Sequence, residues 1–593
     1  MRSRVELLIA VLLTLLAVHL HVVFLLDAGA LWRDEVNSVD FARMPLPVAW
    51  HNLQFDSFPM LSTVLLRGWG SIQSGGGAAT PSAGPPSAAP PAAPLAAAIT
   101  RTDRWFRIYG FVIGLCFLAA VWITCRLLGG RGSPPLLSLA LVGMAPWAIQ
   151  AIDSIRPYGP GIVLIVLAAG FVWRVASTPR SAGRGAASAA RVAVAAVFAI
   201  LSVQAMYQNA FLLLAICVAG VVAALQRSDR GAAVTVLAVG ASAALSLLPY
   251  LHSVAAAREW NPLVQRPTGI SWLFTVFSQA TTPEGSVLGS GIFLVIWIAL
   301  VVVCVIVGVG AIRARRAPSE PASTANPALY CGVLVVAAMV FYFAGLMAAK
   351  VRTEPWYYVP LMALLAPAVD VVIAGATTGT AAFNLRRRKS RTPAPRMFAR
   401  PVIAMAVAAV TIWPAWIQLS KPRTSMDSAA GLISREAAPA DLVVVFPFFY
   451  GVSFQRYYHG TAPWISVPPI DDLRIHRYDL VKQRLMEPTE TMAPVFARMS
   501  ETMKSGHNVW IVGSLPPPDA GVRPVDLPPA PAAGGWNCGP YLHVWGQEVA
   551  QFLEDHATRG RIAQGLSNGK VNFFEDVPVT VPSGWKEAPA TRP

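Results

Sequence analysis

The chain has 593 residues, of which 55% are hydrophobic and only 13% are charged, and its mean hydropathy is +0.52. Soluble globular proteins carry about 25% charged residues, so this composition excludes that class and indicates an integral membrane protein. The formal net charge of +16 does not indicate nucleic-acid binding, because the basic residues are spread over short loops between apolar segments. The six cysteines are scattered, so neither a disulfide framework nor a zinc-binding spacing is expected.

The first apolar segment, residues 7–26, is long enough to cross a bilayer, which takes about 20 residues. It is too long for an ordinary signal peptide and lacks an Ala-x-Ala cleavage site, so we expect a retained anchor. The sequence Trp32-Arg33-Asp34-Glu35 follows directly. Ionisable groups at a membrane surface are costly, so Asp34 and Glu35 are candidate functional residues; a solvated pair of loop carboxylates is the alternative.

Further apolar runs predict about eleven membrane spans in total. After residues 7–26, the predicted spans are 105–128, 135–149, 159–173, 192–206, 210–225, 232–250, 291–312, 328–347, 356–374 and 402–416. Basic residues concentrate in every second loop, from Arg126 to the cluster Arg386-Arg387-Arg388-Lys389. By the positive-inside rule, the N-terminus is then cytoplasmic, whereas Asp34, Glu35 and everything after Trp416 are extracytoplasmic. We expect a multi-pass protein of the inner or plasma membrane.

The first outer loop has two parts. Residues 47–69 are expected to form an amphipathic segment at the interface, with an apolar set made of Trp50, Phe55, Phe58, Leu65, Leu66 and Trp69. Residues 71–100 are rich in Gly, Ala, Pro and Ser, and we expect them to be disordered because they cannot bury a core.

The last 174 residues, 420–593, are expected to form a separate domain. Residues 442–446 and 509–512 are short apolar runs ended by Pro447 and Gly513, which indicates buried strands. Residues 547–556 are predicted to be helical and residues 571–574 to form another strand. The fold class is therefore mainly α: a membrane bundle over residues 1–419, followed by an extracytoplasmic α/β domain.

Two further outer loops carry charged groups beside aromatic ones. Asp153 and Arg156 are about one helical turn apart and can face one another, although a purely structural ion pair is the alternative. The second loop carries Lys350, Arg352, Glu354 and the aromatic run Trp356-Tyr357-Tyr358. For its two cations, a snorkelling anchor at the interface is the alternative. Carboxylates suit proton abstraction, cations suit a phosphate, and aromatic faces suit sugar rings.

This arrangement resembles the GT-C membrane glycosyltransferases, in particular the bacterial glycosyltransferase family 39 group, which is akin to protein O-mannosyltransferases and lipid A aminoarabinose transferases. Besides Trp-x-Asp-Glu after the first span, the matching stretches are Asp56-Ser-Phe-Pro59, Arg107-Ile-Tyr-Gly110, Arg156-Pro-Tyr158 and Tyr357-Tyr-Val-Pro360. The resemblance covers roughly residues 5–375. The chain departs from it at Met60, where relatives have a second proline, at Ser154, where they have an acid, and at Trp356, where they have an arginine.

The resemblance implies an inverting transfer of a sugar from a polyprenyl-phosphate carrier to a lipid, glycan or protein hydroxyl outside the cytoplasm. Asp34 would take the proton from the acceptor, and Glu35 or Asp153 would orient the acceptor or stabilise an oxocarbenium-like sugar. Arg156, Lys350 or Arg352 would hold the leaving phosphate, and Tyr158 and Tyr357 would line the substrate site. The sequence identifies no certain cofactor and leaves the need for a divalent cation open.

Two other functions remain open from the sequence. A transporter or flippase of lipid-linked sugars also has many spans, but it is expected to show internal repeats, broken helices and charges within its spans. Here no repeat is evident and the charged groups lie at span ends on one side, which favours the transferase. A non-catalytic scaffold of the cell envelope is the third function, and the tail carries no chemical motif that excludes it.

Overall fold

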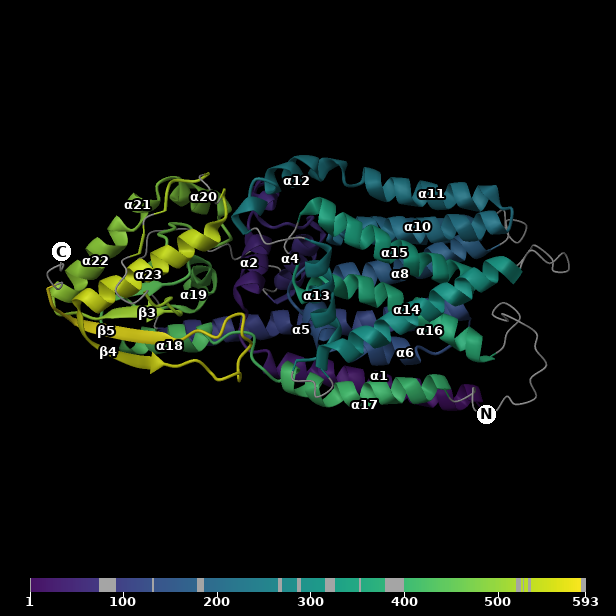
Figure 1. Cartoon of the computed structure of the whole chain (residues 1–593), viewed down its shortest axis with the longest axis horizontal. Coiled ribbons are helices and arrows are strands. Elements are labelled where there is room, and N and C mark those ends of the chain that lie inside the picture. The colour runs from purple at the N-terminus through teal and green to yellow at the C-terminus, as the bar shows by residue number, and fades with distance from the viewer. Residues whose placement is uncertain are drawn as a thin grey trace.

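The structure is a computed structural model that describes residues 2–73, 92–130, 133–178, 186–264, 269–284, 289–314, 326–350, 353–378, 399–518, 524–525, 527–531 and 535–587. Figure 1 shows two parts along the long axis, a bundle of long helices and a C-terminal domain packed on one end of the bundle. The N-terminus lies at the other end of the bundle (Figure 1). The predicted fold class, a mainly helical bundle with a C-terminal domain that contains a sheet, is therefore what the structure has.

Within the described ranges, ten helices are long and apolar enough to cross a membrane. The helices that make up these spans are α1 (Arg2–Asp27), α5 (Ala92–Gly129), α8 (Tyr158–Ser177), α9 (Ala186–Ala205), α10 (Asn209–Gln226), α11 (Arg230–Leu245), α14 (Gly289–Ala314), α15 (Pro327–Ala349), α16 (Val359–Thr378) and α17 (Ala399–Leu419). Large apolar side chains such as Leu15 and Val295 are exposed on their outer faces, as helices in lipid require. The multi-pass helical fold is thus confirmed.

The predicted third span, residues 135–149, is not a continuous helix. It is divided into α6 (Leu136–Ser138), a π turn η2 (Leu139–Gly143) and α7 (Pro146–Ile152). Ala145 is extended and Pro146 starts α7, because proline has no N–H to continue the helix and disfavours helical backbone in the residue before it. Hydropathy shows that this segment is buried, but it does not show the break.

Several short helices connect the long ones. They are α2 (Arg33–Arg43), α3 (Leu46–Asn52), η1 (Leu53–Phe55), α4 (Leu61–Gln73), η4 (Leu248–Tyr250), α12 (Leu251–Ala257), η5 (Asn261–Val264), α13 (Ile270–Thr281) and η6 (Pro355–Tyr358). Figure 1 shows four of them, α2, α4, α12 and α13, toward the end of the bundle that faces the C-terminal domain. The predicted interfacial segment 47–69 is divided between α3, η1 and α4. Residues 71–73 end α4 and residues 92–100 begin α5, so these parts of the predicted disordered tract are helical; residues 74–91 lie outside the described ranges.

The C-terminal domain contains a five-stranded sheet in the order β2-β1-β3-β5-β4. The strands are β1 (Leu442–Val445), β2 (Trp464–Ser466), β3 (Val509–Val512), β4 (Ala557–Gln564) and β5 (Val579–Trp585). Strand β1 pairs in parallel with β2 and β3, and β5 pairs antiparallel with β3 and β4. The predicted strands at 442–446 and 509–512 are confirmed, whereas residues 571–574 form no strand and belong to a loop.

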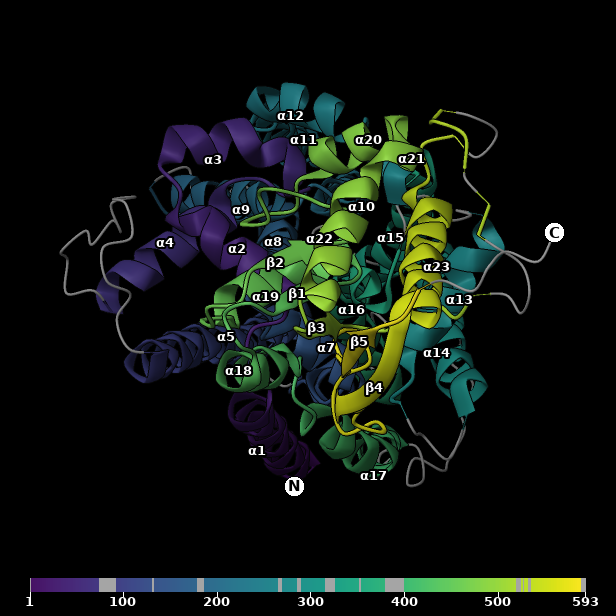
Figure 2. The same cartoon turned by 90° about the vertical axis from the view of Figure 1, so that its left-hand side faces the viewer.

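Helices cover both faces of this sheet, as Figure 2 shows end-on. They are α18 (Met426–Glu436), η9 (Phe448–Tyr450), α19 (Gly451–Tyr457), α20 (Tyr478–Met486), α21 (Pro488–Thr491), α22 (Ala493–Lys504) and α23 (Cys538–His556), the last of which contains the predicted helix 547–556. Leu442 and Val444 pack with α22 and α23, while Val443 and Val445 pack with α18 and α19. Burial on both faces explains why β1 is apolar at four successive positions.

Candidate functional site

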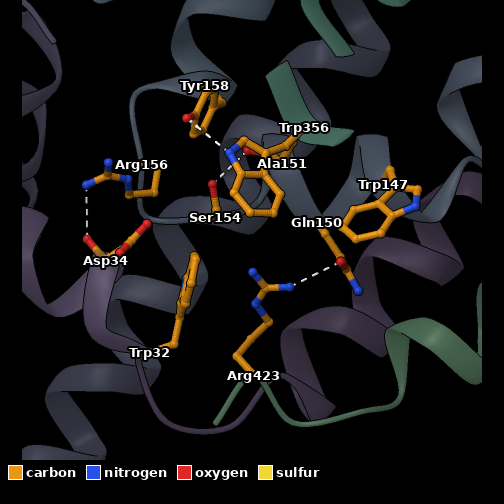
Figure 3. Close-up of a pocket in the computed structure, with 10 residues that line it drawn as sticks. All are labelled: Trp32, Asp34, Trp147, Gln150, Ala151, Ser154, Arg156, Tyr158, Trp356 and Arg423. Atoms are coloured by element: carbon orange, nitrogen blue, oxygen red, sulfur yellow. Dashed lines mark hydrogen bonds between the residues drawn. The ribbon is translucent and has the colours of Figure 1, made fainter. Parts of the chain in front are cut away.

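A cavity of about 210 Å³ lies where the bundle meets the C-terminal domain, and both parts contribute to its wall. Its charged lining residues are Asp34, Asp56, Arg156, Lys350 and Glu354, with His476 beside them. Its aromatic lining residues are Phe55, Phe58, Tyr158, Trp260, Trp356, Tyr357 and Tyr478. A second cavity of about 20 Å³ shares Asp34, Arg156, Tyr158 and Trp356 with the first, and Figure 3 shows the side chains around it.

Asp34 lies in the first turn of α2, where the helix dipole favours a negative charge. Its carboxylate Oδ1 is 3.3 Å from Nε2 of His476 and 3.8 Å from Nε of Arg33. Burial raises the pKa of Asp34, but the hydrogen bond from His476 and the charges of Arg156 and Arg33 outweigh burial and hold the pKa well below its usual range. Asp34 is therefore ionised at neutral pH.

Arg156 ties α2 to the turn after η1. Its Nη1 donates to the carbonyl oxygen of Asp34 at 3.1 Å, to Ser38 Oγ at 3.0 Å and to Asp56 Oδ1 at 3.4 Å. The guanidinium also lies over the Phe58 ring at 5.1 Å. Burial lowers the pKa of Arg156, but the carboxylates of Asp34 and Asp56 outweigh it and raise the pKa. A permanent positive charge therefore faces the cavity.

The third part of the wall comes from the segment after α15. Lys350 ends α15 in the left-handed conformation, with φ at 52°, and lines the cavity together with Glu354 and Tyr357. Trp356 Nε1 donates to the hydroxyl of Tyr158 at 3.2 Å, a contact visible in Figure 3. The predicted phosphate ligand Arg352 lies outside the described ranges.

Glu35 does not line either cavity. It is fully buried and forms an ion pair with Arg107, whose Nη1 is 2.7 Å from its carboxylate. It also accepts hydrogen bonds from the backbone N–H groups of Trp32 and Ile155. The expectation that Glu35 contacts the substrate therefore has no geometric support, because its carboxylate fixes the start of α2 against α5 and the loop before α8.

Asp153 is also away from both cavities. Its carboxylate is 2.8 Å from Nδ1 of His21 in α1, and both side chains are buried. A Cβ atom at Gly110 would collide with the carbonyl oxygen of Asp153, and one at Gly114 would collide with its carboxylate. The Arg107-Ile-Tyr-Gly110 stretch thus lets α5 approach the Asp153 loop closely. The predicted pairing of Asp153 with Arg156 does not occur in the structure.

Sequence reasoning missed the contributions of the C-terminal domain. His476 and Tyr478 line the larger cavity, and Arg423 lines the smaller one. Arg423 lies over the Trp32 ring at 5.1 Å and donates from Nη1 to Gln150 at 3.1 Å, and burial lowers its pKa to about 10. No local motif surrounds these residues, so only the packing of the domain on the bundle reveals them.

Aromatic rings enclose the smaller cavity and the loop beside it. Trp356 packs against Trp32, Trp147 and Phe574, with ring centroids between 5.1 and 6.3 Å apart. Phe574 belongs to the C-terminal loop that was expected to be a strand. Among the residues that the structure describes, no group of three His, Cys, Asp or Glu side chains is placed to hold a metal ion.

Comparison with known proteins gives structural matches alone: no protein-family model matches the chain, and no curated protein matches it. The chain is similar to ArnT from Cupriavidus metallidurans in the apo state (TM-score 0.45, 15% identity, 85% of this chain and 92% of ArnT covered). ArnT bound to undecaprenyl phosphate gives a TM-score of 0.41 over the same coverage. The oligosaccharyltransferase of Archaeoglobus fulgidus with Zn and sulfate gives 0.43, with 13% identity, over 85% of this chain and 67% of that one.

Proposed function

We propose that the protein is a membrane glycosyltransferase that moves a sugar from a polyprenyl-phosphate carrier to an acceptor hydroxyl outside the cytoplasm. One observation carries this proposal: a single cavity brings together the ionised carboxylate of Asp34, the cations of Arg156 and Lys350, and the rings of Tyr158 and Trp356. A carboxylate supports proton removal, fixed cations stabilise a departing phosphate, and aromatic faces pack on sugar rings.

The arrangement supports a direct displacement. The acceptor oxygen attacks the anomeric carbon while the bond from that carbon to the phosphate oxygen breaks, and the electron pair leaves with the phosphate. Arg156 and Lys350 stabilise the charge that grows on the phosphate, and the base centred on Asp34 removes the acceptor proton. Attack opposite to the leaving group inverts the anomeric configuration. Holding both reactants in one partly enclosed cavity supplies the orientation that such a step needs.

The position of the cavity supports a lipid-linked donor. Nucleotide sugars are cytosolic. The cavity is lined by Asp34 of α2, and α2 lies toward the end of the bundle opposite the N-terminus (Figure 1). The positive-inside rule assigns the end that carries α2 to the outside. A carrier whose prenyl chain lies in the bilayer delivers its phosphate to this level of the membrane.

Mass spectrometry of lipid that copurifies with the protein tests the donor class. We expect a polyprenyl phosphate, with or without a sugar. Release of polyprenyl phosphate from a panel of polyprenyl-phosphate sugars then tests the activity, with the Asp34→Asn variant as the inactive control. A wild-type protein that binds no polyprenyl phosphate and consumes no member of the panel would refute the proposal.

One observation favours a lipid-carrier flippase as the second candidate. The predicted third span is broken at Pro146, and transporters use discontinuous helices at their substrate sites. Against it, the charges described above lie at the end of the bundle. Proteoliposomes that hold a fluorescent polyprenyl-phosphate sugar in one leaflet distinguish a flippase from a transferase. A flippase moves the labelled lipid to the other leaflet without breaking the bond between the sugar and the phosphate.

A further inference from the structure

His476 is held against the helix that carries Asp34. Its backbone N–H donates to the side-chain oxygen of Asn37 at 3.0 Å, and Asn37 is a buried residue of α2. Its ring stacks on Tyr478, with centroids 5.9 Å apart and planes at 22°. The side chain is 12% exposed and lines the larger cavity. The imidazole therefore has a fixed position beside the site, although it comes from the C-terminal domain.

The contact with Asp34 determines which ring nitrogen carries hydrogen. Nε2 is 3.3 Å from Oδ1 of Asp34, and an ionised carboxylate only accepts hydrogen bonds, so Nε2 is the donor. In the neutral ring, Nδ1 then carries the lone pair. Within the described part of the chain, no protein group forms a hydrogen bond with Nδ1. Serine hydrolases use the same relation, in which a carboxylate orients a histidine whose second nitrogen accepts a proton.

We propose that Asp34 and His476 form a catalytic dyad in which His476 Nδ1 accepts the proton of the acceptor hydroxyl and Asp34 orients the ring through Nε2. The inference rests on the proposed transferase function and assigns the proton to His476 instead of Asp34. As the bond between the acceptor oxygen and the anomeric carbon forms, the bond to the phosphate oxygen breaks with its electron pair. The proton moves to Nδ1, the carboxylate of Asp34 stabilises the resulting imidazolium, and the proton then passes to water.

Brønsted behaviour favours this assignment, because a general base works best when its pKa lies near the operating pH. Burial raises the pKa of Asp34, but the hydrogen bond from His476 and the charges of Arg156 and Arg33 lower the pKa by more than burial raises it. The net decrease makes the carboxylate a weak base. An imidazole is the side chain suited to neutral pH. The charged and titratable groups that line the same cavity are Asp34 from α2, Asp56 after η1, Arg156 before α8, Tyr158 at the start of α8, Lys350 and Glu354 after α15, Tyr357 from η6, and Tyr478 beside His476. Arg33 from α2 lies next to Asp34.

The variant His476→Gln tests the dyad, because glutamine places an N–H near the position of Nε2 and keeps the bond to Asp34 but cannot accept the proton. We expect release of polyprenyl phosphate from polyprenyl-phosphate sugars to fall about 10²- to 10⁴-fold. The wild type should lose activity on acidification, because a protonated imidazole cannot accept the acceptor proton, and the variant should not. Added imidazole should restore activity to His476→Gly. The control is His543→Gln on α23, an exposed residue outside both cavities.

Two failures are distinguishable in this experiment. If His476→Gln retains the wild-type rate and the wild-type pH profile, the dyad is wrong while the transferase stands. If the wild type releases no polyprenyl phosphate from the panel, the proposed function itself fails and the dyad fails with it.

A second measurement needs no turnover. In ¹⁵N-histidine NMR of the detergent-solubilised protein, the His476 signals are those lost in His476→Gln. At the alkaline end of a pH series, we expect hydrogen on Nε2 and a bare Nδ1 that gains a proton on acidification. Hydrogen on Nδ1 at this pH, or an imidazolium throughout, would overturn the dyad.

Discussion

The backbone N–H of Arg33 at the start of α2 donates to the carboxylate of Glu575 in the C-terminal domain at 3.0 Å. The Arg33 guanidinium also donates to the carbonyl oxygen of Phe574 at 2.9 Å, and Ser453 contacts the other oxygen of Glu575. The first turn of α2, which presents Asp34 to the cavity, is therefore held by a loop near the end of the chain. This contact explains how a domain with no chemical motif of its own can set the geometry of the site.

The Glu575 contact predicts a pH-dependent stability. Burial raises the pKa of Glu575 from 4.5 to about 7, against the charge of Arg33 and the hydrogen bond from Ser453. Folding thus favours the protonated form, so the contribution to stability is fully present below pH 4.5 and is lost as the pH rises through 7. This change in pKa corresponds to about 3 kcal/mol. We expect the melting temperature to fall between about pH 5 and 8 and Glu575→Gln to flatten that dependence. An unchanged slope in the variant would show that other groups cause it.

Asp34→Asn should abolish sugar transfer, with a loss of at least about 10²-fold, while expression and membrane insertion stay near the wild-type level. An amide keeps the shape of the side chain but neither accepts a proton nor stabilises a positive charge on His476. Asp471→Asn is the control for the same substitution, because the Asp471 side chain is 95% exposed and lines neither cavity. Turnover of Asp34→Asn at the wild-type rate would remove Asp34 from the mechanism.

Glu35→Gln should act differently from Asp34→Asn. The Glu35–Arg107 pair is fully buried, and removal of one partner leaves an uncompensated charge that costs about 3–5 kcal/mol. We expect less folded protein and a lower melting temperature, with activity per folded molecule reduced far less than in Asp34→Asn. Replacing both residues, as in Glu35→Gln with Arg107→Met, should recover part of the loss. A stable, correctly folded but inactive Glu35→Gln would instead place Glu35 in the chemistry.

The sequence predicts the parts of this structure that depend on local pattern. The long spans follow from hydropathy, and Asp34 follows from its place after the first span. Successive residues on a helix point about 100° apart, which explains why Asp34 faces the cavity whereas Glu35 faces Arg107. His476 could not be predicted, since it meets Asp34 only when the C-terminal domain docks on the bundle. Hydropathy does not show the break before Pro146, because the whole segment is apolar, although the proline itself is a signal for a break.

Topology gives the last prediction, because the mechanism needs the cavity and the C-terminal domain on the outer side. The turn between α10 and α11 lies at the end of the bundle away from that domain (Figure 1), and it carries Arg227 and Arg230. Basic loops stay in the cytoplasm. In a variant without native cysteines, a cysteine at Asp471 should react with an impermeant maleimide in intact cells, whereas one at Ser228 should react only after lysis. The reverse labelling would place Asp34 and His476 in the cytoplasm, where nucleotide sugars are available, and the case for a polyprenyl-phosphate donor would lose its main support.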